Sequence, residues 1–294
     1  MPKGSEFTED EHYVPRMYLR EFSYIRTKGK KENAFIWQFN LETMKQSDTS
    51  VNVKSICFKK NLYELRDKTG EFIARNIIEK TFSRIENEAS TVIRSIKEKS
   101  QNEKCLNCPT ILSDEDKSIL IIFMTALQFR DPNTIQMGIE SLQQTNPDMT
   151  LNDMRNFTLL NLLPISDIPE WNENTIIRSA TDRLCGMFFQ IGIAPNDVII
   201  SSDRPVIMWP PKENEQFNRP RAIVFPLTSR LVLYLFPMED RKYIGTDWFT
   251  YLSDDQVKEI QMYVAAGARD WIYSKEPLSK EQIELIKKAR QKSC

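Results

Sequence analysis

Apolar residues recur every three or four positions through the middle of the chain, which is the spacing of an amphipathic helix. The clearest case runs from Glu71 to Ile96, where one face is apolar and the other charged. A second segment, 113–129, starts with a capping-box-like Ser-Asp-Glu-Asp and is apolar on nearly every side. We therefore predict a long amphipathic helix and then a buried central helix, which the pair Asp131-Pro132 ends. Further helical pieces are predicted near 133–144, 150–162 and 173–184.

Short β-branched and aromatic runs, typical of strands, flank this helical middle. Before it, the runs at 34–40 and 50–58 predict a short N-terminal hairpin. After it, similar runs lie at 187–193, 197–200, 206–209, 222–225 and 231–236. Capping boxes at Ser253 and Ser279 then predict one helix through Tyr273 and a last helix near the C-terminus.

These elements predict an α+β fold that is rich in helix. Its parts are a short N-terminal hairpin at about 34–58, a helical middle at about 71–185, and an antiparallel sheet with terminal helices at about 187–290. The chain has neither an internal repeat nor a low-complexity linker. We therefore expect residues 1–294 to form a single compact domain.

Charge and composition remove several classes of protein. The chain has 40 Lys plus Arg and 41 Asp plus Glu, so its formal charge of -1 provides no global basic field for nucleic acid. The longest apolar run, Ile119 to Leu127, is far shorter than the roughly 20 residues that cross a bilayer, and the N-terminus lacks the apolar core of a signal peptide. We expect a cytoplasmic protein without a membrane span. No glycine-rich fingerprint of a Rossmann or P-loop nucleotide site is present.

The thiols and the imidazole limit metal chemistry. Five cysteines, an odd and scattered set, favour reduced thiols, and Cys105 and Cys108 are interpreted as part of an ordinary loop. His12 is the single histidine, which excludes centres that need several histidines. No metal ligands are assigned. A carboxylate-held divalent cation stays open without a diagnostic spacing, so the cofactor is unknown.

Two basic or titratable positions near the N-terminus are candidates for chemistry. His12 is either a general acid or base, or a buried imidazole that fixes the N-terminal segment. Arg16 opens a basic stretch interleaved with tyrosines, which suits a phosphate-bearing partner, while a solvated basic surface is the alternative.

Arg130 and Gln128 lie at the end of an otherwise apolar helix. An unpaired buried charge there would cost several kcal/mol, so Arg130 must meet either a carboxylate or a ligand anion. Glu86, seven residues after Glu79 on the amphipathic helix, and Asp203 are the candidate partners.

Ser202 and Asp203 follow a predicted strand and precede Arg204-Pro205. Asp203 either folds back on its own backbone in an Asx turn or belongs to a polar strand end that faces a cleft. Ser202, His12 and Asp203 formally supply a Ser-His-Asp set, but the chain has no G-x-S-x-G nucleophile elbow.

The segment from Glu11 to Phe22, EHYVPRMYLREF, resembles the opening H-Y-V-P-[RQ]-x-Y-L-x-x-F of a bacterial family, the domain of unknown function 4238. The resemblance continues at 126–132 (ALQFRDP), 201–206 (SSDRPV), 225–229 (FPLTS) and 268–273 (ARDWIY), the last resembling a closing helix. Arg204 and Ser229 replace a usual Asn and Pro. The resemblance implies which positions matter, without an established activity.

Together these positions predict an intracellular hydrolase that acts on nucleic acid or nucleotides, in a toxin-like or phage-defence role. His12 would be the acid or base, with Glu86 and Asp203 in the catalytic cluster, and four further residues would bind or orient the phosphate: Arg16, Gln128, Arg130 and Ser202. The alternatives are a noncatalytic recognition module and a sensor of a small anionic ligand. The sensor hypothesis requires that Arg130 is not paired with a carboxylate of the protein. The oligomeric state is left open.

Overall fold

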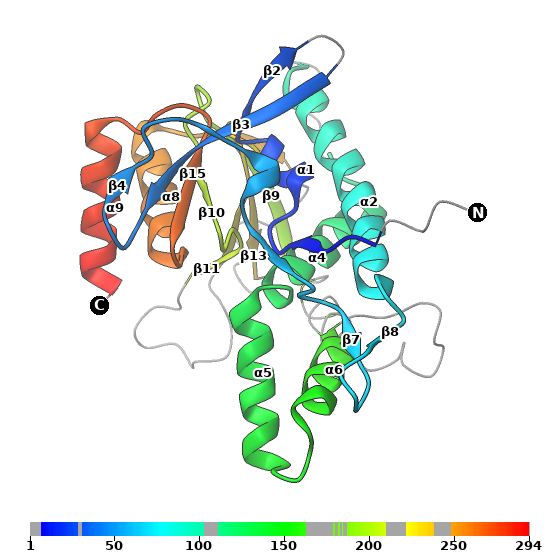
Figure 1. The fold of residues 1–294 in the computed structure, drawn as a ribbon. Helices are drawn as coiled ribbons and strands as arrows, with labels where there is room; N and C mark the ends of the chain where they lie inside the picture. Colours follow the sequence, from blue (N-terminus) through cyan, green and yellow to red (C-terminus); the bar gives the residue numbers. More distant parts are fainter. Residues whose placement is uncertain are drawn as a thin grey trace. The chain divides into compact units, whose positions relative to one another are not determined.

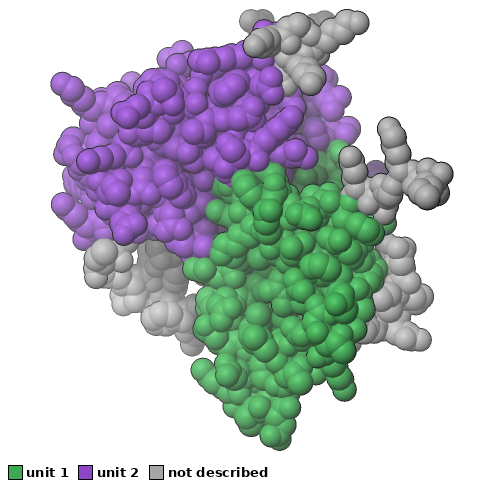
Figure 2. Space-filling model, viewed as in Figure 1, with its two compact units in different colours: residues 1–13, 57–89, 118–185 green, residues 14–56, 90–117, 186–294 purple. Residues whose placement is uncertain are grey.

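The structure is a computed structural model that describes residues 7–28, 31–102, 111–162, 179, 182, 184, 187–209, 222–237 and 248–293 (Figure 1). The chain divides into two compact units, each assembled from three separate stretches (Figure 2). Unit 1 comprises residues 1–13, 57–89 and 118–185, and unit 2 comprises residues 14–56, 90–117 and 186–294. The chain therefore passes repeatedly between the units, and neither is a continuous segment.

Unit 1 combines short strand pairs with helices. Its strands are β1 (Asp10–His12), β6 (Phe58–Lys60), β7 (Leu65–Arg66) and β8 (Phe72–Ile73). β1 pairs antiparallel with β6, and β7 with β8. Its helical parts are the N-terminal part of α2 (Ile77–Ser100), most of α4 (Asp114–Phe129), α5 (Pro132–Thr145) and α6 (Leu151–Leu162). The helices α5 and α6 lie side by side (Figure 1).

The start of α2 differs from the sequence prediction. The apolar positions Ile78, Phe82 and Ile85 are buried, as the amphipathic pattern requires. The helix nevertheless begins at Ile77, not at Glu71, because Phe72 and Ile73 pair in β8 and the residues that follow are not helical. Ala74 and Asn76 have φ angles of 49° and 58°, which a right-handed helix excludes.

The boundary between α4 and α5 confirms the local signals. The capping box is present, since Ser113 Oγ accepts from the Asp116 N–H and Asp116 Oδ2 accepts from the Ser113 N–H. α4 ends at Phe129, and Asp131 then caps the next helix through a bond from the Thr134 N–H, with Pro132 in its first turn. The Asp-Pro pair thus ends one helix and starts another.

Unit 2 contains two larger sheets. In the six-stranded sheet, the order is β10-β15-β3-β2, and β4 and β5 also pair with β3. In the five-stranded sheet, the order is β11-β12-β13-β9-β14, and only the β14–β9 pair is parallel. The strands are β2 (Tyr24–Lys28), β3 (Lys31–Asn40), β4 (Lys45–Gln46), β5 (Val51–Asn52), β9 (Phe188–Ile193), β10 (Ser201–Ser202), β11 (Ile207–Trp209), β12 (Ala222–Pro226), β13 (Leu231–Phe236), β14 (Trp248–Tyr251) and β15 (Trp271–Ser274). The helices are α1 (Arg16–Arg20), the 3-10 turn η1 (Val53–Ser55), α8 (Asp254–Gly267) and α9 (Lys280–Ser293).

Tyr18 connects α1 to both sheets of unit 2. Its fully buried hydroxyl lies 2.8 Å from Ser201 Oγ on β10 and donates to the Pro226 carbonyl on β12, also at 2.8 Å. Its ring stacks on Phe225 with a centroid distance of 5.4 Å. Tyr18 therefore has a direct packing role in unit 2.

The fold is α+β, with an N-terminal hairpin and antiparallel sheet in the C-terminal half. Two predicted elements are wrong. Residues 197–200 are not a strand: Ile199 and Ile200 are buried in an irregular segment, and the strand begins at Ser201. The helix from Ser253 ends at Gly267. The residues from Trp271 to Tyr273, expected to be its last turn, belong to β15, which pairs with β3.

Three other expectations depend on which residues are described. The predicted helix at 173–184 lies almost entirely outside the described residues. Cys57 is buried and is not part of a disulfide, while the other four cysteines lie outside the described residues. In the part of the chain that the structure covers, no helix combines the length and the apolar character that a bilayer crossing needs.

Candidate functional site

Arg130, directly after α4 in unit 1, is almost completely buried, with 2% of its surface exposed. Its Nη1 lies 2.7 Å from Glu86 Oε1 on α2, and its Nη2 donates to the main-chain oxygen of His12 on β1. The guanidinium carbon lies 4.1 Å from the centroid of the Phe82 ring. The expected carboxylate partner is therefore Glu86, and the arginine links β1, α2 and the end of α4.

Tyr63 completes this buried polar cluster. Its hydroxyl donates to the Arg130 carbonyl at 2.8 Å, and its backbone N–H donates to Glu11 Oε2 at 2.7 Å. Burial raises the pKa of the Tyr63 hydroxyl, and the neighbouring Arg130 only partly opposes this. Burial opposes the charge of Arg130, but the carboxylates of Glu86 and Glu79 stabilise it, and the Arg130 pKa is raised. At neutral pH the cluster thus consists of a charged arginine and a neutral tyrosine.

The remaining unit 1 candidates are His12 and Gln128. The His12 imidazole is 9% exposed and lies 5.5 Å from the ring of Phe58, its partner in the β1–β6 pair. Its main-chain oxygen accepts a hydrogen bond from Arg130. Gln128 is half-buried near the end of α4.

In unit 2, Asp203 stabilises a loop. Its two carboxylate oxygens accept from the backbone N–H groups of Arg269 and Asp270, at 2.9 and 2.8 Å, just before β15. Burial raises the pKa of this carboxyl, although these two N–H groups oppose the change. The local turn is made by Ser202, whose Oγ accepts from the Arg204 N–H at 3.2 Å, and not by an Asx turn of Asp203. Arg16 is exposed at the first position of α1.

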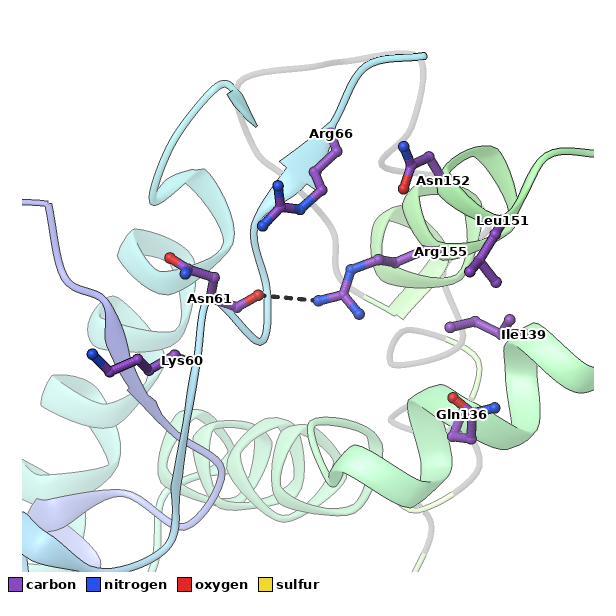
Figure 3. Close-up of a pocket in the computed structure, with 8 residues that line it drawn as sticks. All are labelled: Lys60, Asn61, Arg66, Gln136, Ile139, Leu151, Asn152 and Arg155. Atoms are coloured by element: carbon purple, nitrogen blue, oxygen red, sulfur yellow. Dashed lines mark hydrogen bonds between the residues drawn. The ribbon is translucent and has the colours of Figure 1, made fainter. Parts of the chain in front are cut away.

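Unit 1 has a pocket of about 370 Å³ (Figure 3). It lies between the segment around Lys60 and Asn61, at the end of β6, and the helices α5 and α6. Its lining has three cationic, three amide and two apolar side chains and, in the described structure, no carboxylate: Lys60, Arg66, Arg155, Asn61, Gln136, Asn152, Ile139 and Leu151. An excess of cations over acids in a concave site favours an anionic ligand.

Arg155 projects from α6 toward the segment that follows β6 (Figure 3). Its Nη2 donates to the carbonyl oxygens of Asn61 and Leu62, at 3.1 and 2.6 Å. Among the described residues, no carboxylate lies within ion-pair distance of its guanidinium. Burial lowers the Arg155 pKa, and the like charge of Arg66 lowers it further. A half-buried arginine without a described carboxylate at ion-pair distance is suited to bind an anion.

The surrounding backbone holds this arginine in place. Asn156, the next residue on α6, accepts from the Arg66 N–H at 3.1 Å and donates to the Arg66 carbonyl at 2.6 Å, which fixes α6 against β7. Arg66 itself donates to the Gly70 carbonyl at 2.8 Å and covers the Phe72 ring at 4.1 Å. Asn61 adopts a φ of 51°, a left-handed conformation that asparagine tolerates better than most residues. Hydrogen bonds between α6 and β7 therefore fix the two elements that carry Arg155 and Arg66.

Glu11, on β1 of the same unit, is a buried acid with 1% of its surface exposed. Its Oε2 accepts from Tyr63, but its Oε1 is buried without a hydrogen-bond partner among the described residues. Burial is the main reason that its pKa is raised to about 7, with smaller contributions from Glu79 and Glu64. Its carboxyl group therefore changes charge near neutral pH.

Sequence reasoning missed the pocket cations and Glu11. Arg155 is one charged residue on an ordinary amphipathic helix, and Glu11 belongs to the acidic run TEDEH, which is typical of a solvated surface. Neither position carries a local signal, because their significance depends on a contact with a segment distant in sequence. Within the described ranges, no three His, Cys, Asp or Glu side chains gather as a metal site would require.

Comparison with known proteins identifies a family. The family model described as Protein of unknown function (DUF4238) matches residues 11–277. No curated protein and no solved structure matches the chain. The match starts at Glu11, contains both the Arg130 cluster and the cationic pocket, and covers most of the chain. The chain therefore belongs to the DUF4238 family.

Proposed function

We propose that this protein is a binding protein for a small anionic ligand, and that the ligand occupies the cationic pocket of unit 1. The observation that carries the proposal is the state of Arg155. Its guanidinium is half-buried, has two backbone carbonyls as partners, and faces a pocket whose described lining holds Lys60 and Arg66 but no acid.

The size and lining of the pocket favour a phosphorylated small molecule such as a nucleotide. A volume of about 370 Å³ is at the lower end of small-molecule sites, which range over about 300–1,000 Å³. Arginine binds phosphate through paired N–H donors, and lysine supplies a point charge. Ile139 and Leu151 provide an apolar wall for the uncharged part of such a ligand.

This proposal replaces Arg130 by Arg155 as the anion-binding group. Arg130 is paired with Glu86 and the His12 carbonyl, so it is not free of protein carboxylates. The hydrolase hypothesis assigned phosphate binding to Arg130 and a catalytic role to Asp203, whose oxygens accept from two backbone N–H groups. These contacts support our choice of ligand binding as the proposal, and hydrolysis is the competing hypothesis that the experiment must test.

The experiment is a ligand screen by thermal shift, followed by calorimetry, with inorganic phosphate, a nucleoside monophosphate and a short single-stranded oligonucleotide. We expect the monophosphate to bind, and Lys60→Gln to weaken it roughly 10-fold, because a charge-assisted hydrogen bond contributes about 1.5–3 kcal/mol. Lys60 is exposed, so this variant leaves the core intact. Lys68→Gln, an exposed unit 1 lysine outside the pocket, is the matched control.

Two results would contradict the proposal. The first is that none of the three probes binds. The other is turnover of the monophosphate or oligonucleotide that depends on His12 and Asp203, which would restore the hydrolase hypothesis.

A further inference from the structure

Glu11 and Arg155 bind the same short stretch of backbone in unit 1. Arg155 donates to the carbonyls of Asn61 and Leu62, and Glu11 accepts from the N–H of Tyr63, the next residue. The acid of β1 and the arginine of the pocket are thus bound to opposite sides of one peptide group, which consists of the Leu62 carbonyl and the Tyr63 N–H. A change of charge at either side chain therefore changes the electrostatic energy of the other.

The environment of Glu11 makes its ionised form costly. The side chain is 1% exposed, and Oε1 lacks a hydrogen-bond partner among the described residues. Burial of a carboxylate with one unsatisfied oxygen costs desolvation free energy, and this cost is much smaller for the neutral carboxylic acid.

The charged groups around Glu11 come from several elements. Glu79 on α2 and Glu64 before β7 disfavour its negative charge, whereas Arg155 on α6 and the Tyr63 N–H favour it. Lys59 lies opposite Glu11 in the β1–β6 pair but is exposed, and His12 follows Glu11 on the strand. Arg155 is therefore the group through which the pocket acts on Glu11.

We propose that Glu11 couples the cationic pocket to pH, so that binding of an anion at Arg155 is accompanied by uptake of a proton on the Glu11 carboxylate. This inference rests on the proposed anion-binding function. A bound anion adds negative charge and offsets the favourable effect of Arg155 on the Glu11 carboxylate, so the neutral carboxylic acid becomes the favoured form. The proton comes from solvent and forms an O–H bond on Glu11.

The coupling is reciprocal. If an anion favours protonated Glu11, then protonated Glu11 favours the anion by the same factor. Since the pKa of Glu11 is about 7 in the free protein, the affinity should be higher below this pH and should fall as the pH rises through it.

The test uses inorganic sulfate, whose charge is constant between about pH 5.5 and 8.5. Calorimetric titrations in buffers of different ionisation enthalpy measure both the affinity and the protons taken up. We expect an affinity about 3- to 10-fold higher at the acidic end and an uptake of a fraction of one proton near neutral pH. Glu11→Gln should remove both effects, and Glu71→Gln, which changes an exposed carboxyl of unit 1, should preserve them.

The outcomes separate this inference from the proposed function. Sulfate binding that is independent of pH and without proton uptake overturns the coupling and leaves the anion site standing. An unchanged pH dependence in Glu11→Gln assigns the proton to another group, such as His12, and also overturns it. Absence of sulfate binding at every pH overturns the coupling, and the proposed function is overturned as well if inorganic phosphate, the monophosphate and the oligonucleotide also fail to bind. If Glu11→Gln does not fold, the buffer series on the natural chain still decides whether a proton is taken up.

Discussion

The guanidinium of Arg130 and the carboxylate of Glu86 form a 2.7 Å ion pair between the end of α4 and α2. The arginine is almost fully buried, and it also binds the main chain of β1. This pair brings together segments that are 44 residues apart in the chain, so it stabilises the packing of unit 1. Because Arg130 has these partners within the protein, we propose Arg155 as the residue that binds the ligand.

Loss of Arg130 should therefore act on stability. Arg130→Ala leaves the Glu86 carboxylate and the His12 carbonyl without their partner, and we expect it to lower the free energy of unfolding by about 3–5 kcal/mol in urea denaturation. The double variant Arg130→Met/Glu86→Leu should cost less, because it removes the stranded charge. Lys80→Ala, on the exposed face of α2, should change stability by less than about 0.5 kcal/mol. An effect of Arg130→Ala as small as that of Lys80→Ala would contradict the structural role.

The raised pKa of Glu11 predicts a pH dependence of stability with a definite sign. Its pKa of about 7 in the folded chain lies above the ordinary 4.5, so the folded state binds more protons between these values. Stability from this group is complete below about pH 4.5 and is lost as the pH rises to about 7, a total of about 3 kcal/mol.

Glu11→Gln should flatten this slope, since glutamine keeps an acceptor for the Tyr63 N–H but does not titrate. The measurement is urea denaturation at several pH values, comparing the variant with the natural chain. Parallel curves for the two proteins would show that Glu11 does not titrate in this range.

Asp203 should contribute through the loop before β15. Asp203→Ala removes the acceptor of two backbone N–H groups, and we expect a loss of about 1–3 kcal/mol. Asp203→Asn keeps one acceptor oxygen and should lose less. Chemical denaturation of both variants checks this order, and an Asn variant less stable than the Ala variant would refute it.

Local sequence signals predicted the helices well and the long-range partners poorly. The capping boxes at Ser113, Ser253 and Ser279 are all present, because each depends on residues three positions apart. The residues 271–273 follow a helical pattern, which predicts helix, but they pair with β3, which is more than 200 residues earlier in the chain. The sequence around residues 271–274 contains no signal that β3 is the pairing partner.

In the candidate site, too, the sequence predicted some features and not others. The burial of Arg130 and its pairing with Glu86 were predictable, since a charge in an apolar helix needs a counter-ion. The pocket was not, because Lys60, Arg66 and Arg155 come from β6, β7 and α6, and each looks like a surface residue in its own segment.

The path of the chain predicts how the protein resists proteolysis. Each compact unit is assembled from three stretches, so no single cut releases a complete unit. We expect one cooperative unfolding transition and no stable fragment that corresponds to unit 1 or unit 2. Limited proteolysis that yields two stable fragments of comparable size would contradict the expectation of a single domain.

The anion pocket is tested most directly by calorimetric titration of a nucleoside monophosphate into the natural chain and into Arg155→Gln at low ionic strength. Circular dichroism beforehand confirms that the variant is folded, and Lys68→Gln is the control for charge alone. The account predicts saturable binding to the natural chain and to Lys68→Gln, and an affinity at least about 10-fold lower in folded Arg155→Gln. Equal affinity in all three proteins, or no binding to the natural chain, would contradict it.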